Sequence, residues 1–242
     1  MSFSRSSMSL LTFGVGLFAA ATNGCSDEKS PATTFAITSA AFQDGQAIPD
    51  EYTCTGKTFP YSGSPPVDHT SPQLSWTAGP AGTMSYAIVF KDTTLTTATP
   101  INELGYHWAI YNIPTSVLSL AKGLPSGNPI AAVTGAKQYS GPLFNDGFVG
   151  PCPSWSVAPG SPLLGTDPAP TVSTDSYTFT VFAMPTATIT EPTMRPAPAT
   201  DAPPISYTKD LDDTLIANAI ASAKLATTSS AQPAMFATPP AP

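Results

Sequence analysis

The segment from residue 106 to residue 114 limits the possible folds more than any other part of the chain. It is dominated by aromatic and β-branched residues and ends at Pro114, which is typical of a buried β-strand. Alternation places its residues on two faces: His107, Ala109, Tyr111 and Ile113 on one, and Trp108, Ile110 and Asn112 on the other. We therefore expect a sheet that contains this strand and carries a histidine where the strand begins.

His107 has two interpretations. It can be a core or rim histidine whose ring is satisfied by a hydrogen bond, or it can belong to a site for an anion or a proton. The second interpretation requires partners from elsewhere in the chain. The other histidine, His69, lies in a stretch rich in Pro, Gly and Ser (residues 57–72), which predicts an exposed loop.

Two further segments predict strong strands, at residues 85–92 and 177–184. The first is largely apolar on both faces, as expected for a central strand. The chain also contains 28 prolines, which break helices, and only 10% charged residues. Its 242 residues are enough for one large domain or two small ones. We expect an all-β dominated fold with long loops.

The C-terminal region predicts a single helix followed by a tail. An apolar stripe at helical spacing over residues 211–225 is formed by Leu211, Leu215, Ile216, Ala219 and Ile220. The acidic residues Asp210, Asp212 and Asp213 lie near its amino end, where they are expected to be capping charges. Residues 227–242 consist largely of Ala, Thr, Ser and Pro, which predicts a disordered tail.

Residues 1–24 are expected to be a signal peptide rather than part of the fold. Arg5 is their only charged residue, and it precedes an apolar run from Met8 to Ala21. That run is too short to cross a bilayer as a stable helix. A positive start, a short apolar core and small residues after it form the pattern of an export signal.

The end of this signal has two candidates. Residues 19–21 fit a signal-peptidase site of the A-x-A type, whereas residues 22–25 resemble a bacterial lipoprotein box with Cys25 as the acylated residue. The count of three cysteines favours the lipoprotein. If Cys25 is lipidated, Cys54 and Cys152 remain as an even pair in an oxidising compartment.

The formal net charge of −7 argues against nucleic acid as a partner, because no basic stripe could neutralise phosphates. It also argues against electrostatic attachment to an anionic membrane. We expect membrane attachment only through the lipid on Cys25, with residues 25–34 as lipidated cysteine and polar tether. Ser26 permits outer-membrane delivery, so the expected location is periplasm-facing; a soluble periplasmic or secreted protein is the alternative.

Five short motifs occur in the chain in a fixed order. They are Phe42-x-Asp44-Gly45-x-x-Ile48-Pro49-x-x-Tyr52-Thr53-Cys54-x-Gly56, Ser71-Pro72-x-Leu74-Ser75-Trp76, Gly82-Thr83-x-Ser85-Tyr86-Ala87-Ile88, His107-Trp108-x-x-Tyr111-Asn112-Ile113-Pro114 and Gly150-Pro151-Cys152-Pro153. Together they resemble the phosphatidylethanolamine-binding protein family, in its bacterial Raf-kinase-inhibitor-like branch. The resemblance implies one domain over residues 35–226, a β-sandwich of two antiparallel sheets with a C-terminal helix.

The resemblance also implies a small pocket for phosphate-like groups at one end of the central sheet. The residues that match its pattern, together with the strand residue beside it, are Asp92, His107, Gly150, Pro151, Pro153 and Tyr177. Two departures stand out. Thr93 and Thr94 replace a Pro and a second Asp, and Asp175 stands where a second histidine is expected. A carboxylate there places negative charge where an anion would bind, so the pocket is either altered, accepting a neutral or cationic group, or inactive.

The same resemblance brings Cys54 and Cys152 near one end of the sandwich. A disulfide between them would close a loop of about 98 residues, worth about 4–5 kcal/mol on the chain-entropy model. Two buried free thiols are the alternative.

The expected function is a non-catalytic binding protein for a small anion or phospholipid head group near His107. The alternative is a protein-interaction or inhibitor module that acts through surface loops on an unknown protein partner. We expect no enzyme, cofactor or metal, because no nucleophile–histidine arrangement and no common zinc-ligand set can be found. A homodimer is compatible with the family.

Overall fold

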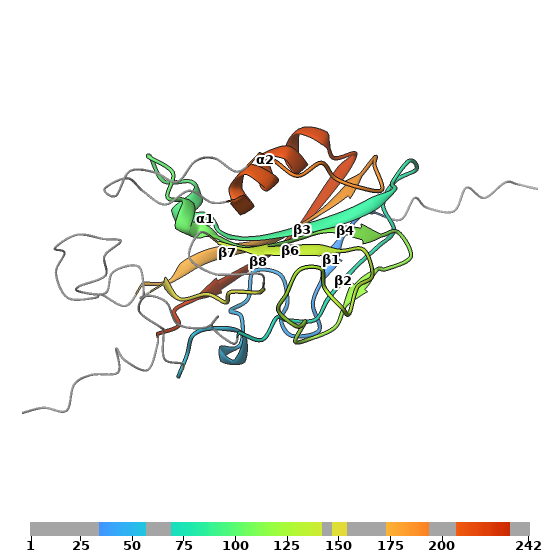
Figure 1. The fold of residues 1–242 in the computed structure, drawn as a ribbon. Helices are drawn as coiled ribbons and strands as arrows, with labels where there is room; N and C mark the ends of the chain where they lie inside the picture. Colours follow the sequence, from blue (N-terminus) through green and yellow to red (C-terminus); the bar gives the residue numbers. More distant parts are fainter. Residues whose placement is uncertain (1–33, 57–68, 142–146, 154–172, 194–206, 233–242) are drawn as a thin grey trace, which may run out of the picture. The chain divides into compact units, whose positions relative to one another are not determined.

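Strands dominate the structure, a computed structural model that describes residues 34–56, 69–141, 147–153, 173–193 and 207–232 (Figure 1). The larger sheet has the order β6 (Lys137–Ser140), β4 (Tyr106–Pro114), β3 (Ser85–Asp92), β7 (Asp175–Met184) and β8 (Ala221–Ser229). The smaller has the order β1 (Ile37–Thr38), β2 (Leu74–Trp76) and β5 (Ser119–Leu120). All pairings within the two sheets are antiparallel. The predicted architecture of two antiparallel sheets is confirmed.

Short helical elements connect and cover the strands. α1 (Thr93–Thr96) directly follows β3, and α2 (Tyr207–Asn218) precedes β8. Two 3₁₀ turns, η1 (Asp50–Tyr52) and η2 (Glu103–Gly105), lie in the connections before β2 and β4. In the described residues no helix is long and apolar enough to cross a membrane.

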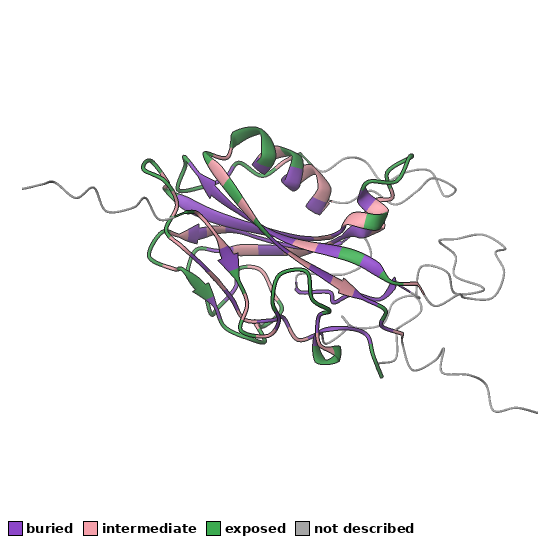
Figure 2. Cartoon of the chain, turned by 180° about the vertical axis from the view of Figure 1, so that it is seen from behind, coloured by how far each residue is buried: buried purple, intermediate pink, exposed green. Residues whose placement is uncertain are grey.

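The larger sheet separates two apolar cores. On one face, Ile88, Phe90 and Phe179 pack with residues of the smaller sheet such as Leu74. On the other face, Ala87 and Val89 pack with the α2 residues Leu211 and Leu215. Figure 1 shows α2 above the larger sheet and β1 and β2 beneath it. The central strands of the larger sheet are therefore covered on both faces, as their burial in Figure 2 also shows.

Strand β3 follows the predicted alternation. Tyr86, Ile88 and Phe90 face the sandwich core, and Ala87 and Val89 face α2. Both faces are apolar because both are covered, which is the property that predicted a central strand.

Strand β4 departs from the predicted alternation at two bulges. Tyr86 pairs with Ile113 while Ile88 pairs with Ile110, so β4 carries one extra residue there. Asn112, with φ 57°, is in the left-handed region that such a bulge requires. The extra residue moves Ile113 into the sandwich core beside Ile110. The expectation that Ile113 shares a face with Ala109 was therefore wrong, because a bulge shifts the two-residue period.

The C-terminal region also differs from its prediction. The helix ends at Asn218, and residues 221–229 form β8 instead of continuing the predicted helix to residue 225. β8 pairs with β7 from Ala221 to Ser229 in an unbroken register, and that ladder outweighs the helical stripe. Ile216 and Ile220, expected in the stripe, are 59% and 41% exposed.

The predicted tail therefore began too early. Residues 227–229 are ordinary strand residues, and Thr227 and Ser229 are buried. The remaining tail residues 233–242 lie outside the described residues, as do the predicted signal peptide 1–24 and Cys25.

A segment near the start of the domain covers part of the outer edge of β8. The amide of Gly45 donates to the carbonyl of Ala226 (2.9 Å), and the amide of Ile48 donates to that of Thr228 (3.0 Å). The Asp44 carboxylate accepts a hydrogen bond from the Ala226 amide (2.7 Å). The first and last parts of the domain are thus joined at this edge.

Candidate functional site

Three strand ends bring the predicted site residues together. β3 ends at Asp92, β4 begins next to it in the antiparallel pairing, and Asp92 lies opposite Tyr177 of β7. We call the four residues Asp92, His107, Asp175 and Tyr177 the Asp–His cluster. Asp92, Asp175 and Tyr177 are 1%, 7% and 1% exposed. Buried polar side chains cost free energy unless they are hydrogen-bonded, so each partner matters.

His107 occupies the second bulge of β4. Phe90 pairs with Trp108 and Lys91 pairs with Tyr106, which leaves His107 without a residue opposite it. Bulges can redirect a side chain in this way. The His107 ring contacts Phe90 and Tyr177, with both centroid distances 5.5 Å.

The imidazole of His107 is also held by the backbone. Its Nδ1 lies 3.2 Å from the carbonyl oxygen of Val149, and the backbone of Gly150 lies close by. Burial lowers the pKa of His107 to about 4, although hydrogen bonding to the backbone opposes the effect. The ring is therefore neutral at pH 7, and its Nδ1–H donates a hydrogen bond to the backbone.

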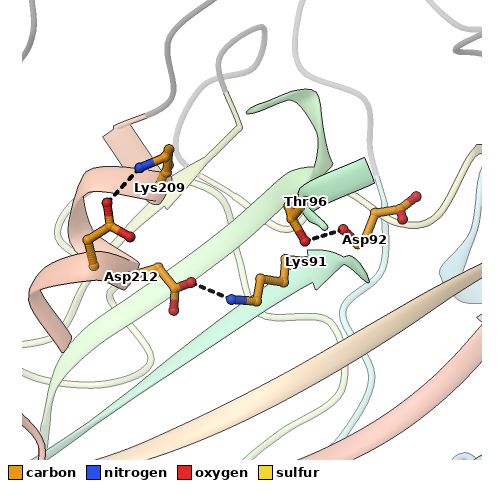
Figure 3. A network of polar contacts seen from close by, with 6 residues as sticks. Lys91, Asp92, Thr96, Lys209 and Asp212 are labelled. Atoms are coloured by element: carbon orange, nitrogen blue, oxygen red, sulfur yellow. Dashed lines mark hydrogen bonds and ion pairs between the residues drawn. The ribbon is translucent and has the colours of Figure 1, made fainter. Parts of the chain in front are cut away.

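Asp92 joins β3 to α1. Its Oδ1 accepts a hydrogen bond from the Leu95 amide (3.0 Å), so the side chain caps the short helix. Its backbone carbonyl accepts from the Thr96 hydroxyl (2.7 Å), as Figure 3 shows. This capping holds the Asp92 carboxyl group at the sheet end.

The carboxyl groups of Asp92 and Asp175 are hydrogen-bonded to each other. Burial, followed by the charge of Asp175, raises the pKa of Asp92, and burial raises the pKa of Asp175. The Tyr177 hydroxyl donates to Asp92, and burial raises the pKa of Tyr177 as well. Two neighbouring carboxyl groups in a poorly solvated place resist ionising together, which agrees with the raised pKa values of both.

The two threonines that replace the expected Pro and Asp connect α1 to β7. The Thr94 hydroxyl accepts from the Ser176 amide (3.0 Å), and the Thr93 hydroxyl donates to the Ser176 carbonyl (2.9 Å). These contacts fix the beginning of β7, and with it Asp175, against the end of β3.

The turn at residues 147–153 packs against the segment that contains Cys54. A Cβ on Gly150 would lie 1.9 Å from the Tyr52 carbonyl oxygen, so only glycine fits there. The Cys54 amide donates to the Pro151 carbonyl (3.1 Å), and the structure contains the Cys54–Cys152 disulfide that the resemblance implied. The turn is thereby held beside His107.

His69 is a residue that sequence reasoning misjudged. It is 5% exposed rather than lying in an exposed loop, and its Nδ1 accepts a hydrogen bond from the Gly150 amide (2.7 Å). The composition of its surroundings predicted a loop, most of which lies outside the described residues, and contained no signal for the contact with a turn 81 residues away.

Asp212 is the second such residue. It was expected to be a capping charge, but it lies on the buried face of α2 and is fully buried. The ammonium of Lys91 lies 2.5 Å from its carboxylate (Figure 3). Burial raises the pKa of Asp212, and Lys91 opposes the effect. This ion pair is on the α2 side of the sheet, away from the Asp–His cluster. Among the described residues no three His, Cys, Asp or Glu side chains gather as potential metal ligands.

Comparison with known proteins defines the class to which this fold and cluster belong. Residues 38–230 match the sequence model of the family described as phosphatidylethanolamine-binding protein. The chain belongs to the phosphatidylethanolamine-binding protein family, as its motifs predicted. The fold agrees: the structure of Escherichia coli YbcL, described as a new member of the mammalian PEBP family, superposes with a TM-score of 0.55. That likeness, at 24% identity, covers 82% of this chain and 99% of YbcL.

Two bacterial proteins are among the curated relatives of the chain. A UPF0098 protein of Aquifex aeolicus is 31% identical over 117 residues, which are 48% of this chain and 57% of that relative. The putative lipoprotein LppC of Mycobacterium tuberculosis is 28% identical over 152 residues, 62% of this chain and 56% of LppC. The matches thus span less than two thirds of these relatives.

Proposed function

We propose that this protein is a non-catalytic binding protein that holds a small polar ligand, of the phospholipid head-group type, at the Asp–His cluster. One observation carries the proposal. Three strand ends and a disulfide-held turn place four polar residues together among aromatic rings at one end of the sheet. Polar groups that are expensive to bury and have shifted pKa values mark candidate binding sites.

A binding role fits the cluster better than catalysis does. Among the described residues, the partners of the His107 ring are the rings of Phe90 and Tyr177 and the carbonyl of Val149, and none of them is a serine or thiol nucleophile that the ring could activate. Cys54 and Cys152 are joined in the disulfide and cannot act as thiolates.

We further propose that the protein is exported and anchored by a lipid on Cys25. The match to the putative lipoprotein LppC supports this proposal. The disulfide supports it as well, because disulfides persist in oxidising compartments.

The test is a thermal-shift titration of the full chain with phosphoethanolamine. A ligand that binds only the folded state raises the unfolding midpoint with the logarithm of its concentration. We expect a saturable rise in the wild type. In His107→Ala we expect the affinity to fall by about tenfold or more. Leu215→Ala, which weakens the remote core under α2, is the control for lost stability and should keep the ligand's effect. No rise in the wild type contradicts the proposal and points to a protein partner instead.

A further inference from the structure

The donors around the Asp–His cluster are already used within the protein. The Gly150 amide donates to His69, and the His107 ring donates through Nδ1 to the backbone carbonyl of Val149. The Tyr177 hydroxyl donates to Asp92. An oxyanion needs N–H or O–H donors, and none of these three groups can turn to it without losing its present partner.

The two amides nearest the carboxyl pair are used in the same way. The Leu95 amide donates to Asp92 and the Ser176 amide donates to Thr94. An anion would therefore have to break hydrogen bonds that hold α1 and β7 in place.

The lysines of the described residues do not make up for the missing donors. Of the five lysines within the described part of the chain, four pair with carboxylates elsewhere: Lys91, Lys122, Lys137 and Lys209. The fifth, Lys224, is exposed on β8, opposite Thr180 in the middle of the ladder. Within the described residues, the titratable groups at this sheet end are thus the two carboxyl groups, the Tyr177 hydroxyl and the neutral imidazole.

The Asp175 carboxyl group can still accept hydrogen bonds from a ligand. Asp92 already accepts from Leu95 and Tyr177, whereas Asp175 accepts from Asp92 and is the more exposed of the two carboxyl groups. A carboxylate offers about four lone-pair sites, so Asp175 can accept further hydrogen bonds.

We infer that the Asp–His cluster binds a ligand through a primary ammonium group placed against Asp175, and that it does not accept an isolated oxyanion. This inference rests on the proposed function and specifies which end of a head group the site recognises. An ammonium group brings three donors, no acceptor and one positive charge, which together match a pair of carboxyl groups that is rich in acceptors.

The test compares four compounds by thermal shift on the full chain at pH 7: ethanolamine, choline, inorganic phosphate and acetate. We expect ethanolamine to raise the midpoint saturably. Choline, whose quaternary nitrogen has no N–H donor, should have an affinity about tenfold lower than that of ethanolamine, or lower still. Phosphate and acetate should have no saturable effect.

Variants make the test specific. Asp175→Asn should lose about tenfold or more in affinity for ethanolamine. Asp213→Asn, the same change on the exposed face of α2, should lose none. Asp175→His removes the charge and adds a donor, so it should reverse the preference toward phosphate.

The outcomes distinguish a failure of this inference from a failure of the proposed function. A saturable shift with phosphate or acetate but none with ethanolamine overturns the inference and leaves the proposed function standing. No shift with these four compounds or with phosphoethanolamine overturns both. Vesicles of phosphatidylglycerol, with and without phosphatidylethanolamine, identify the source of the amine. Sedimentation that depends on phosphatidylethanolamine assigns a lipid head group, and ethanolamine binding without it assigns a free amine.

Discussion

Lys91 and Asp92 are consecutive residues of β3, yet their side chains enter opposite layers of the domain. The Lys91 ammonium lies 2.5 Å from the Asp212 carboxylate under α2, while Asp92 caps α1 and meets Asp175 at the sheet end. Figure 3 shows Lys91 paired with Asp212 and, next along the strand, Asp92 in contact with Thr96 of α1. One strand end thus attaches α2 to the sheet and builds the candidate site.

Breaking the Lys91–Asp212 pair from one side should destabilise the domain strongly. Lys91→Met leaves the buried Asp212 carboxylate without its cation, and we expect a loss of about 3 kcal/mol in the free energy of unfolding. Lys209→Met removes the partner of the exposed Asp213 and should cost about 1 kcal/mol or less. Urea denaturation measures both, and equal losses would contradict the buried character of the first pair.

The carboxyl pair should make the domain less stable as the pH rises. Both folded-state pKa values are raised above those of the unfolded chain. The stabilisation from the protonated carboxyl groups is therefore fully present below the unfolded pKa, near 4, and is lost as the pH rises through the folded values. Asp175→Asn removes the part of this loss that Asp175 causes, so its stability relative to wild type should increase between pH 4 and pH 8, by about 1.4 kcal/mol per unit by which the pKa of Asp175 is raised.

The measurement is the urea midpoint of wild type and Asp175→Asn at several pH values in that interval. Asp213→Asn provides the baseline for a surface carboxylate. A constant difference between Asp175→Asn and wild type across the interval would show that the pKa of Asp175 is not raised.

His107 should titrate well below an ordinary histidine. Its pKa is lowered to about 4 by burial, so the stability from its neutral form is present above about 6.5 and is lost as the pH falls toward 4. The NMR shift of its ring protons, assigned with His107→Gln, reports the titration directly. A midpoint near 6.5 would mean that the ring is solvated rather than enclosed by Phe90 and Tyr177.

The Cys54–Cys152 disulfide should contribute substantially to stability. It joins residues 98 apart in sequence. On the chain-entropy model its removal costs about 4–5 kcal/mol. The double variant Cys54→Ser/Cys152→Ser, compared with wild type by urea denaturation, measures this cost. If adding reductant to the wild type leaves its midpoint unchanged, the bond is absent in solution.

The strands that carry the site could be predicted because their pattern is local. The segments at 85–92, 106–114 and 177–184 showed aromatic and β-branched runs, and antiparallel pairing of their ends brings Asp92, His107 and Tyr177 together. The bulges at His107 and Asn112 could not be predicted, because register depends on the partner strand.

Contacts between distant segments explain the remaining misses. The helical stripe of residues 211–220 predicted a helix that continues to residue 225, whereas the ladder with β7 makes residues 221–229 a strand. His69 and Asp212 are buried through partners 81 and 121 residues away in sequence. Neither separation leaves a trace in the local pattern of residues.

The hydrogen bonds between residues 44–48 and β8 have a consequence for how the domain is made. Asp44 and Ala226 are 182 positions apart, so the outer edge of the larger sheet closes only after nearly the whole domain has been synthesised or translocated. Until then β7 is an unprotected edge strand of ten residues, open to pairing with other chains. Assembly of this fold therefore has a late and vulnerable final step, and a chain truncated before residue 221 would remain permanently at that stage.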